Sequence, residues 1–130
     1  MVFARRVYRI AGIYGLLVMV PQYFLERKTG GDYPPPITHP EYFYGFIGIT
    51  IAWQIAFLII SMDPVRFRPL MLATLVEKVT FVIATVVMLV LSRPIPAPIV
   101  AGAAIDAVLF VLFAMAYRKT TDVATWKPAR

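Results

Sequence analysis

Four long apolar stretches alternate with polar or proline-containing segments along the chain. They cover residues 7–25, 42–62, 69–91 and 98–117. About 20 apolar residues, at 1.5 Å per residue, span the roughly 30 Å hydrocarbon core of a membrane, so each stretch is long enough to cross it. The pattern predicts one all-α domain over residues 1–130, an integral membrane four-helix transmembrane bundle.

The first stretch follows a basic start, which is also typical of a signal peptide. Arg5, Arg6 and Arg9 precede the apolar run 10–20, and Pro21 comes next. A signal peptide would need small residues at a cleavage site after the run, and none follows here. We therefore expect a retained first helix.

The first connection is the only long one, and its composition predicts two kinds of structure. Residues 29–32, with two glycines, predict a flexible turn, and residues 34–36, all proline, predict a stiff, extended piece. Thr38 with Glu41 matches a capping box at the start of the second helix. In the other interpretation, His39 and Glu41 form a metal or proton site, although two ligands are too few for a metal centre.

The second and third connections are short and bounded by prolines. Pro64 follows the second stretch and Pro69 opens the third, while Pro94, Pro96 and Pro98 separate the third stretch from the fourth. Short connections make the helices that they join antiparallel neighbours.

The composition favours a membrane protein over a soluble one. The chain is 60% hydrophobic with a mean hydropathy of +0.75, whereas a soluble domain is nearer half apolar. The absence of cysteine excludes disulfides, thiol nucleophiles and thiolate metal sites. The net charge of +6 is compatible with nucleic acid binding, but the basic residues lie at helix ends rather than in one patch. We therefore expect no nucleic acid partner.

The basic residues alternate between the two sides of the predicted bundle. Three lie before or at the start of the first stretch, two in the second connection and four in the tail, which places nine on one side. The first and third connections together hold three. Cytoplasmic segments carry the excess of Lys and Arg, so both termini are expected in the cytoplasm, as suits a bacterial inner (plasma) membrane. The nine are Arg5, Arg6, Arg9, Arg66, Arg68, Arg118, Lys119, Lys127 and Arg130.

Three ionisable residues lie inside the apolar stretches, namely Glu77, Lys78 and Asp106. Charged groups in hydrocarbon are costly, so they face the interior of a bundle, pair with one another or mark a functional site. Counted from the ends of their helices, Glu77 and Asp106 differ in depth by ~6 Å. Lys78 points ~100° away from Glu77, so these two are not expected to pair, but its long stem can reach Asp106.

Further polar and aromatic residues fall at a similar depth. Tyr14 and Gln54 lie level with Glu77, and they complete a polar layer near the middle of the membrane. Trp53 and Phe110 are expected to line the wall beside it. The candidate ligand-binding residues are Tyr14, Trp53, Gln54, Glu77, Lys78, Asp106 and Phe110.

Two of the stretches have faces of distinct character. The second carries a small-residue stripe and, nearly opposite, a polar stripe, so both sides are expected to contact something other than lipid. In the third, the face opposite the charged residues is expected to meet lipid. The small-residue stripe is Gly45, Gly48, Ala52 and Ala56, the polar stripe is Thr50, Gln54 and Ser61, and the lipid face is Leu75, Val79, Val82 and Val86.

Four interpretations of the polar layer remain open. In the simplest, its side chains hydrogen-bond across helices and fix the packing, although Ser, Thr, Asn or Gln would suffice for that. In the second, they form the floor of a cavity for a small molecule. In the third they form a proton or ion path, and in the fourth a surface for another membrane subunit.

No catalytic constellation is evident in the sequence. The chain shows no nucleophile–base pair, no phosphate-binding glycine loop and only one histidine, His39. A haem or metal site with two histidines is thereby excluded within one chain. We expect no catalytic residue, metal or cofactor, and we favour a binding protein over an enzyme.

Several segments resemble the DoxX-like group of small four-span bacterial membrane proteins. The similarity lies in His39-Pro-Glu-Tyr-Phe-Tyr-Gly-Phe, in Asp63-Pro-Val-Arg-Phe-Arg-Pro and in Glu77-Lys78 of the third stretch. This resemblance implies a four-helix membrane bundle and does not fix an activity.

The second stretch also resembles the sterol-isomerase-like (EXPERA) four-span bundles, in which carboxylates line a lipophilic pocket. Trp53-Gln54 carries the similarity. Thr50 and Gln54 supply no carboxylate on that helix, so the resemblance implies the fold and not isomerase chemistry.

The leading hypothesis is a membrane protein that holds a lipophilic molecule, such as a sterol-like, quinone-like or lipid molecule, near Glu77 and Asp106. Glu77 is then the polar anchor, and Lys78 with Asp106 sets its charge state. The first alternative is an accessory subunit of a larger membrane complex, stable only with its protein partner. The second is a proton- or ion-coupled transporter that works as a homo-oligomer, since four spans are few for a monomeric carrier.

Overall fold

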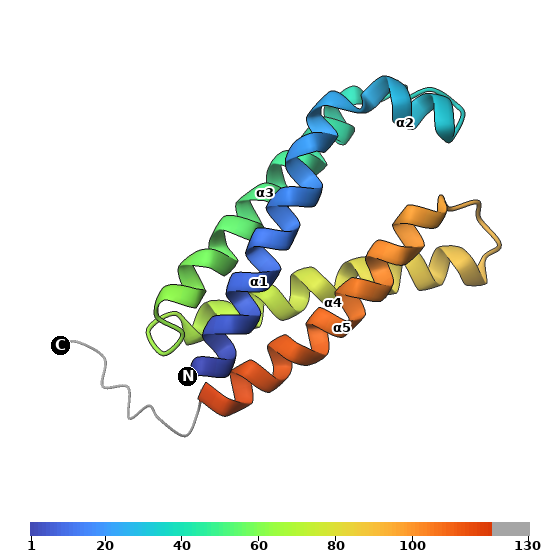
Figure 1. The fold of residues 1–130 in the computed structure, drawn as a ribbon. Helices are drawn as coiled ribbons and strands as arrows, with labels where there is room; N and C mark the ends of the chain where they lie inside the picture. The colour runs from blue at the N-terminus through green and yellow to red at the C-terminus, as the bar shows by residue number, and fades with distance from the viewer. Residues whose placement is uncertain (121–130) are drawn as a thin grey trace.

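The structure is a computed structural model that describes residues 1–120. These residues are helical apart from short connections, and no strand occurs among them (Figure 1). The elements are α1 (Val2–Met19), the 3-10 turn η1 (Val20–Phe24), α2 (Glu26–Asp32), α3 (Pro40–Met62), α4 (Arg68–Val90) and α5 (Ala97–Thr120). The prediction of an all-α fold is confirmed.

Three of the helices, α3, α4 and α5, are long and apolar enough to cross a membrane. They indicate an integral membrane protein. The first long helix, α1, is not among them, because its 18 residues include Arg5, Arg6 and Arg9.

The four long helices form two antiparallel hairpins. In one hairpin α1 packs against α3, and in the other α4 packs against α5; these are the two most extensive helix contacts. The hairpins meet near the N-terminus and diverge toward α2 and the connection after α4 (Figure 1). Although a short connection joins α3 to α4, as predicted, the two helices diverge from it and contact each other little.

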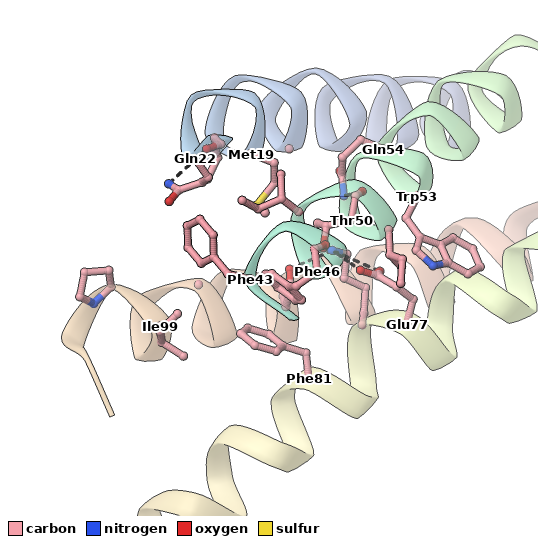
Figure 2. Close-up of a pocket in the computed structure, with 18 of the residues that line it drawn as sticks. Met19, Gln22, Phe43, Phe46, Thr50, Trp53, Gln54, Glu77, Phe81 and Ile99 are labelled. Atoms are coloured by element: carbon pink, nitrogen blue, oxygen red, sulfur yellow. Dashed lines mark hydrogen bonds and ion pairs between the residues drawn. The ribbon is translucent and has the colours of Figure 1, made fainter. Parts of the chain in front are cut away.

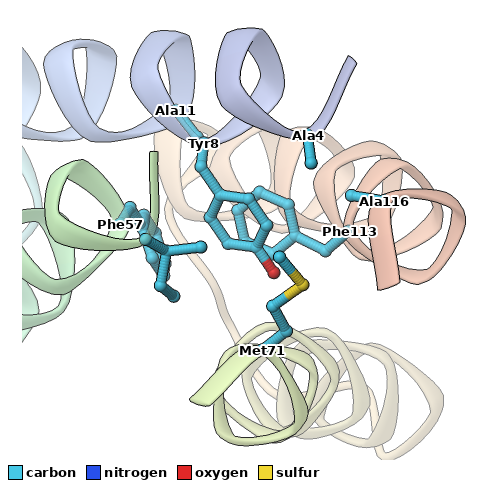
Figure 3. Close-up of a cluster of buried hydrophobic side chains, with 8 residues drawn as sticks. Ala4, Tyr8, Ala11, Phe57, Met71, Phe113 and Ala116 are labelled. Atoms are coloured by element: carbon cyan, nitrogen blue, oxygen red, sulfur yellow. The ribbon is translucent and has the colours of Figure 1, made fainter. Parts of the chain in front are cut away.

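An aromatic cluster joins the hairpins at the end where they meet (Figure 3). Tyr8 of α1 stacks on Phe113 of α5, with ring centroids 4.2 Å apart, and Phe57 of α3 packs edge-on to both. Met71 of α4 completes the cluster. All four side chains are fully buried. Each long helix therefore contributes one large side chain, and this end holds the hairpins together.

The hydroxyl of Tyr8 makes a buried hydrogen bond beside this cluster. Thr74 Oγ1 donates to the carbonyl of Met71 at 2.7 Å, so the Tyr8 hydroxyl is the donor to Thr74 Oγ1, at 2.8 Å. Interhelical hydrogen bonds in membranes contribute ~0.6 kcal/mol on average, and Tyr8→Phe is expected to lower the free energy of unfolding by that amount. Tyr8→Ala removes the ring and is expected to cost about 3–5 kcal/mol. Unfolding in detergent measures the free energy of unfolding of both variants. An equal loss of stability in Tyr8→Phe and Tyr8→Ala would show that the hydroxyl, not the ring, stabilises the fold.

The first helical region differs from its predicted bounds. The sequence predicts one helix over 7–25, but α1 begins at Val2 and ends at Met19, and η1 follows it. Pro21 has no N–H to donate within an α-helix, and its ring clashes with the preceding turn. The chain therefore changes to a 3-10 turn at this point.

The flexible turn predicted at residues 29–32 is wrong, because these residues belong to α2. The ion pair between Lys28 and Asp32, 2.7 Å long, spans one turn of this helix. The backbone of Gly30 packs closely on Pro36, since a Cβ at Gly30 would lie 3.1 Å from the Cα of Pro36. Local pairing and close packing thus order a segment whose two glycines favour a turn.

The capping box predicted at the start of α3 is also wrong. His39 occupies the N-cap position, and no side chain makes a capping hydrogen bond there. Glu41 instead pairs with His39, with 3.0 Å between Oε1 and Nδ1, and both side chains are exposed. Among residues 1–120, no group of three or more His, Cys, Asp or Glu side chains is placed to hold a metal ion.

The face of α4 that was expected to meet lipid is mostly covered. Leu75, Val79 and Val82 are half-buried, because α4 packs along α5 and Leu75 contacts the aromatic cluster. Only Val86 of the expected set is exposed. The large apolar residues of α4 that are exposed are Leu72, Val76, Ile83, Val86, Val87, Leu89 and Val90.

The two stripes of α3 have different surroundings. In the polar stripe, Gln54 and Ser61 are buried and Thr50 is half-buried. In the small-residue stripe, Gly45 and Ala52 are exposed. Within the described part of one chain, only the polar stripe is well covered.

Candidate functional site

A cavity of about 1130 Å³ lies between the diverging hairpins. Side chains from α1, η1 and α3 line one side, and side chains from α4 and α5 line the other (Figure 2). Most of these side chains are apolar, with Phe46, Phe81 and Ile99 prominent in the wall. The cavity therefore offers an apolar volume that one chain leaves unfilled.

Three charged residues meet in this cavity, and we call them the charged triad. Lys78 Nζ lies 3.0 Å from Asp106 Oδ1 and 3.3 Å from Glu77 Oε2. The predicted pairing of Lys78 with Asp106 is confirmed. The expectation that Lys78 and Glu77 do not pair is wrong, because the flexible lysine stem brings the ammonium between both carboxylates even though the two Cβ atoms diverge.

The triad presents its carboxylates, rather than its ammonium, to the cavity. The Lys78 side chain is only 5% exposed, whereas the side chains of Glu77 and Asp106 are 17% and 16% exposed. The ammonium also lies 5.2 Å from the ring centroid of Phe57, within the range of a cation–π contact. The lysine ammonium thus lies between Phe57 and the carboxylates, and the carboxylates are the groups that a ligand would contact.

One buried carboxylate oxygen of the triad lacks a hydrogen bond. Glu77 Oε2 is buried and has no hydrogen-bond partner among the described residues, because its 3.3 Å contact with Lys78 Nζ lacks hydrogen-bond geometry. The other oxygen, Oε1, accepts a long hydrogen bond of 3.5 Å from Lys78. Buried polar atoms are normally paired, so this oxygen has an unused capacity for a donor.

The other predicted site residues lie around the triad without bonding to it. Tyr14, Trp53 and Gln54 line the cavity. Gln54 donates one N–H of its amide to the carbonyl of Thr50 in its own helix, at 3.1 Å. Phe110 is not among the lining residues.

On α5 the lining residues include Ile99, Gly102, Asp106 and Leu109. Phe110 follows one turn after Asp106 but is not part of the cavity wall. Sequence reasoning also missed Phe81, although its place beside Lys78 on one helical face could have identified it.

The short helix α2 borders the cavity at the end where the hairpins diverge, which we call the open end. Lys28 and Asp32 of α2 line this end of the cavity. Tyr44 of α3 donates to Glu26 Oε2 at 2.5 Å, which fixes the start of α2 to α3. The hydrogen bond and charge of Asp32 raise the pKa of Lys28 above its ordinary value, so this ammonium stays charged.

No protein-family model, curated protein or solved structure matches the chain. The resemblances to the DoxX-like group and to the EXPERA bundles therefore stay predictions.

Proposed function

We propose that the chain is a polytopic membrane protein that binds a lipophilic small molecule in the cavity between its hairpins. The observation that carries the proposal is the combination of an apolar volume of about 1130 Å³ with the charged triad on its wall. Ligand sites are typically concave and mostly apolar, with a few polar groups that fix orientation. Packing alone would not need three ionisable groups at this depth.

The proposal includes four membrane spans, with α1 and η1 together forming the first. Residues 10–24 carry no charged side chain, so this part can lie in hydrocarbon while Arg5, Arg6 and Arg9 remain at the surface. The N-terminus, the connection between α3 and α4 and the end of α5 lie at one end of the bundle (Figure 1). This is the basic end, which we place in the cytoplasm of a bacterial inner membrane. Lys127 and Arg130 of the basic tail lie outside the described residues.

Native mass spectrometry of the protein released gently from its own membrane tests the binding. We expect an added mass typical of a lipid or other lipophilic molecule in the wild type, and its loss in Glu77→Gln with the thermal unfolding temperature little changed. Glu41→Gln makes the same chemical change at an exposed carboxylate and should keep the ligand. Parallel loss of ligand and stability in Glu77→Gln would favour a purely structural role for the triad.

A second candidate is an accessory subunit of a membrane complex. Gly45 and Ala52 leave a small-residue surface on α3 that is exposed, and nothing lies within 4 Å of a Cβ placed at Gly45. Small residues permit close approach of another helix in a membrane. Stoichiometric release of another protein with the chain, and of no small molecule, would favour this candidate.

A further inference from the structure

The charges of the triad do not balance. Glu77 and Asp106 contribute two carboxylates and Lys78 one ammonium, so the fully ionised triad carries one net negative charge. Among the residues that line the cavity, the other basic side chain is Lys28 at the open end, where it pairs with Asp32 at 2.7 Å. It is therefore engaged away from the triad.

The remaining polar groups around Glu77 do not supply the missing positive charge. Tyr14 of α1 and Thr50 and Gln54 of α3 line the cavity and are neutral, and Asp106 of α5 adds negative charge. An uncompensated charge is costly at membrane depth. Two compensations fit this site, namely a proton on one carboxyl group or the positively charged head of a ligand.

The Glu77 oxygen that lacks a hydrogen bond indicates where the compensation belongs. Glu77 Oε2 is buried without a hydrogen bond, so it can carry a proton when no cation is bound or, after a small rotation of its carboxyl group, accept a hydrogen bond from an N–H donor. Both compensations use the same carboxylates, so they exclude each other.

We propose that the cavity binds a lipophilic cation, an amine with a long alkyl chain, whose ammonium head replaces a proton held by Glu77. The inference rests on the proposed function and names its ligand class. The amine enters already protonated, and the proton from the carboxyl group leaves to water. The apolar wall that includes Trp53, Phe46 and Phe81 takes the alkyl chain.

Three ligands that share one alkyl chain and differ in the head group test this inference. They are hexadecylamine, hexadecanol and hexadecanoate, added to the full chain in lipid nanodiscs near neutral pH. The wild type is expected to bind the amine about tenfold more tightly than the alcohol, and the carboxylate least. Binding of the amine should release a proton, which a pH indicator in weakly buffered solution detects. Because the proton competes with the amine for the carboxylate, the affinity for the amine should rise with pH.

Two variants and one matched control attribute the effect to the triad. Glu77→Gln and Asp106→Asn each remove the excess negative charge, so each should abolish the preference for the amine and the proton release. Glu41→Gln, at an exposed carboxylate outside the cavity, should leave both unchanged. Equal binding of amine and alcohol by the wild type would overturn the inference and leave the proposed function standing. Failure of all three ligands to bind would overturn both.

Discussion

Replacing Lys78 with methionine is expected to lower the free energy of unfolding by about 3–5 kcal/mol, because it breaks a buried ion pair from one side. The ammonium lies 3.0 Å from Asp106 and 3.3 Å from Glu77, and the lysine side chain is 5% exposed. Methionine keeps much of the apolar stem but leaves two carboxylates without a cation between them. The cost arises from the loss of the cation beside these carboxylates rather than from lost packing.

Removing all three charges together separates these contributions. Lys78→Met combined with Glu77→Gln and Asp106→Asn is expected to recover most of the lost stability, because no unpaired ion remains. Unfolding in a denaturing detergent, followed by the helical circular dichroism signal, measures the single and triple variants. A triple variant as unstable as Lys78→Met would show that the lysine acts through its contact with Phe57.

Gly12→Ala is expected to force α1 away from α3 and to lower the free energy of unfolding by about 1–3 kcal/mol, as overpacking does elsewhere. A Cβ at Gly12 would lie 2.9 Å from the carbonyl oxygen of Gln54 and 2.8 Å from Cδ2 of Leu58. The Leu58 side chain can turn away. The Gln54 carbonyl moves only if the backbone of α3 moves with it.

Two other glycines provide matched comparisons for this variant. At Gly15 a Cβ would overlap the side chain of Gln54, which can rotate if it gives up its hydrogen bond to Thr50, so Gly15→Ala should cost less than Gly12→Ala. At Gly45 nothing lies within 4 Å, and Gly45→Ala should be neutral or stabilising by up to about 1 kcal/mol through helix propensity. Thermal unfolding of the three variants in one detergent tests this order. Equal effects at Gly12 and Gly45 would contradict the close approach of α1 to α3.

Hydropathy and prolines were sufficient to place the long helices after the first connection. The predicted stretches 42–62 and 69–91 nearly coincide with α3 and α4, because prolines stand at the boundaries. The pairing of Lys78 with Asp106 was also predictable, since a charged group in hydrocarbon has few partners to choose from. The contact between Lys78 and Glu77 was not, because a helical wheel describes Cβ directions and a lysine stem is long and flexible.

The arrangement of the hairpins was not accessible from the sequence. A short connection makes α3 and α4 neighbours, but it does not determine the angle between them. That angle decides which side chains line the cavity, and so the sequence did not identify Phe46 and Ile99 as lining residues and placed Phe110 in the wall, where it does not lie. Local signals also misled at α2, where contacts of Gly30 with Pro36 outweigh the preference of glycine for turns.

The position of the aromatic cluster makes it a pivot for the two hairpins. At 1.5 Å per residue, about 25 Å of α3 separates Phe57 from Pro40. A rotation of roughly 10° about the cluster would therefore displace the far end of α3 by about 4 Å, while the rings themselves move little. The packing of Tyr8, Phe57, Met71 and Phe113 at one end of the bundle therefore constrains the separation of the hairpins at the other end.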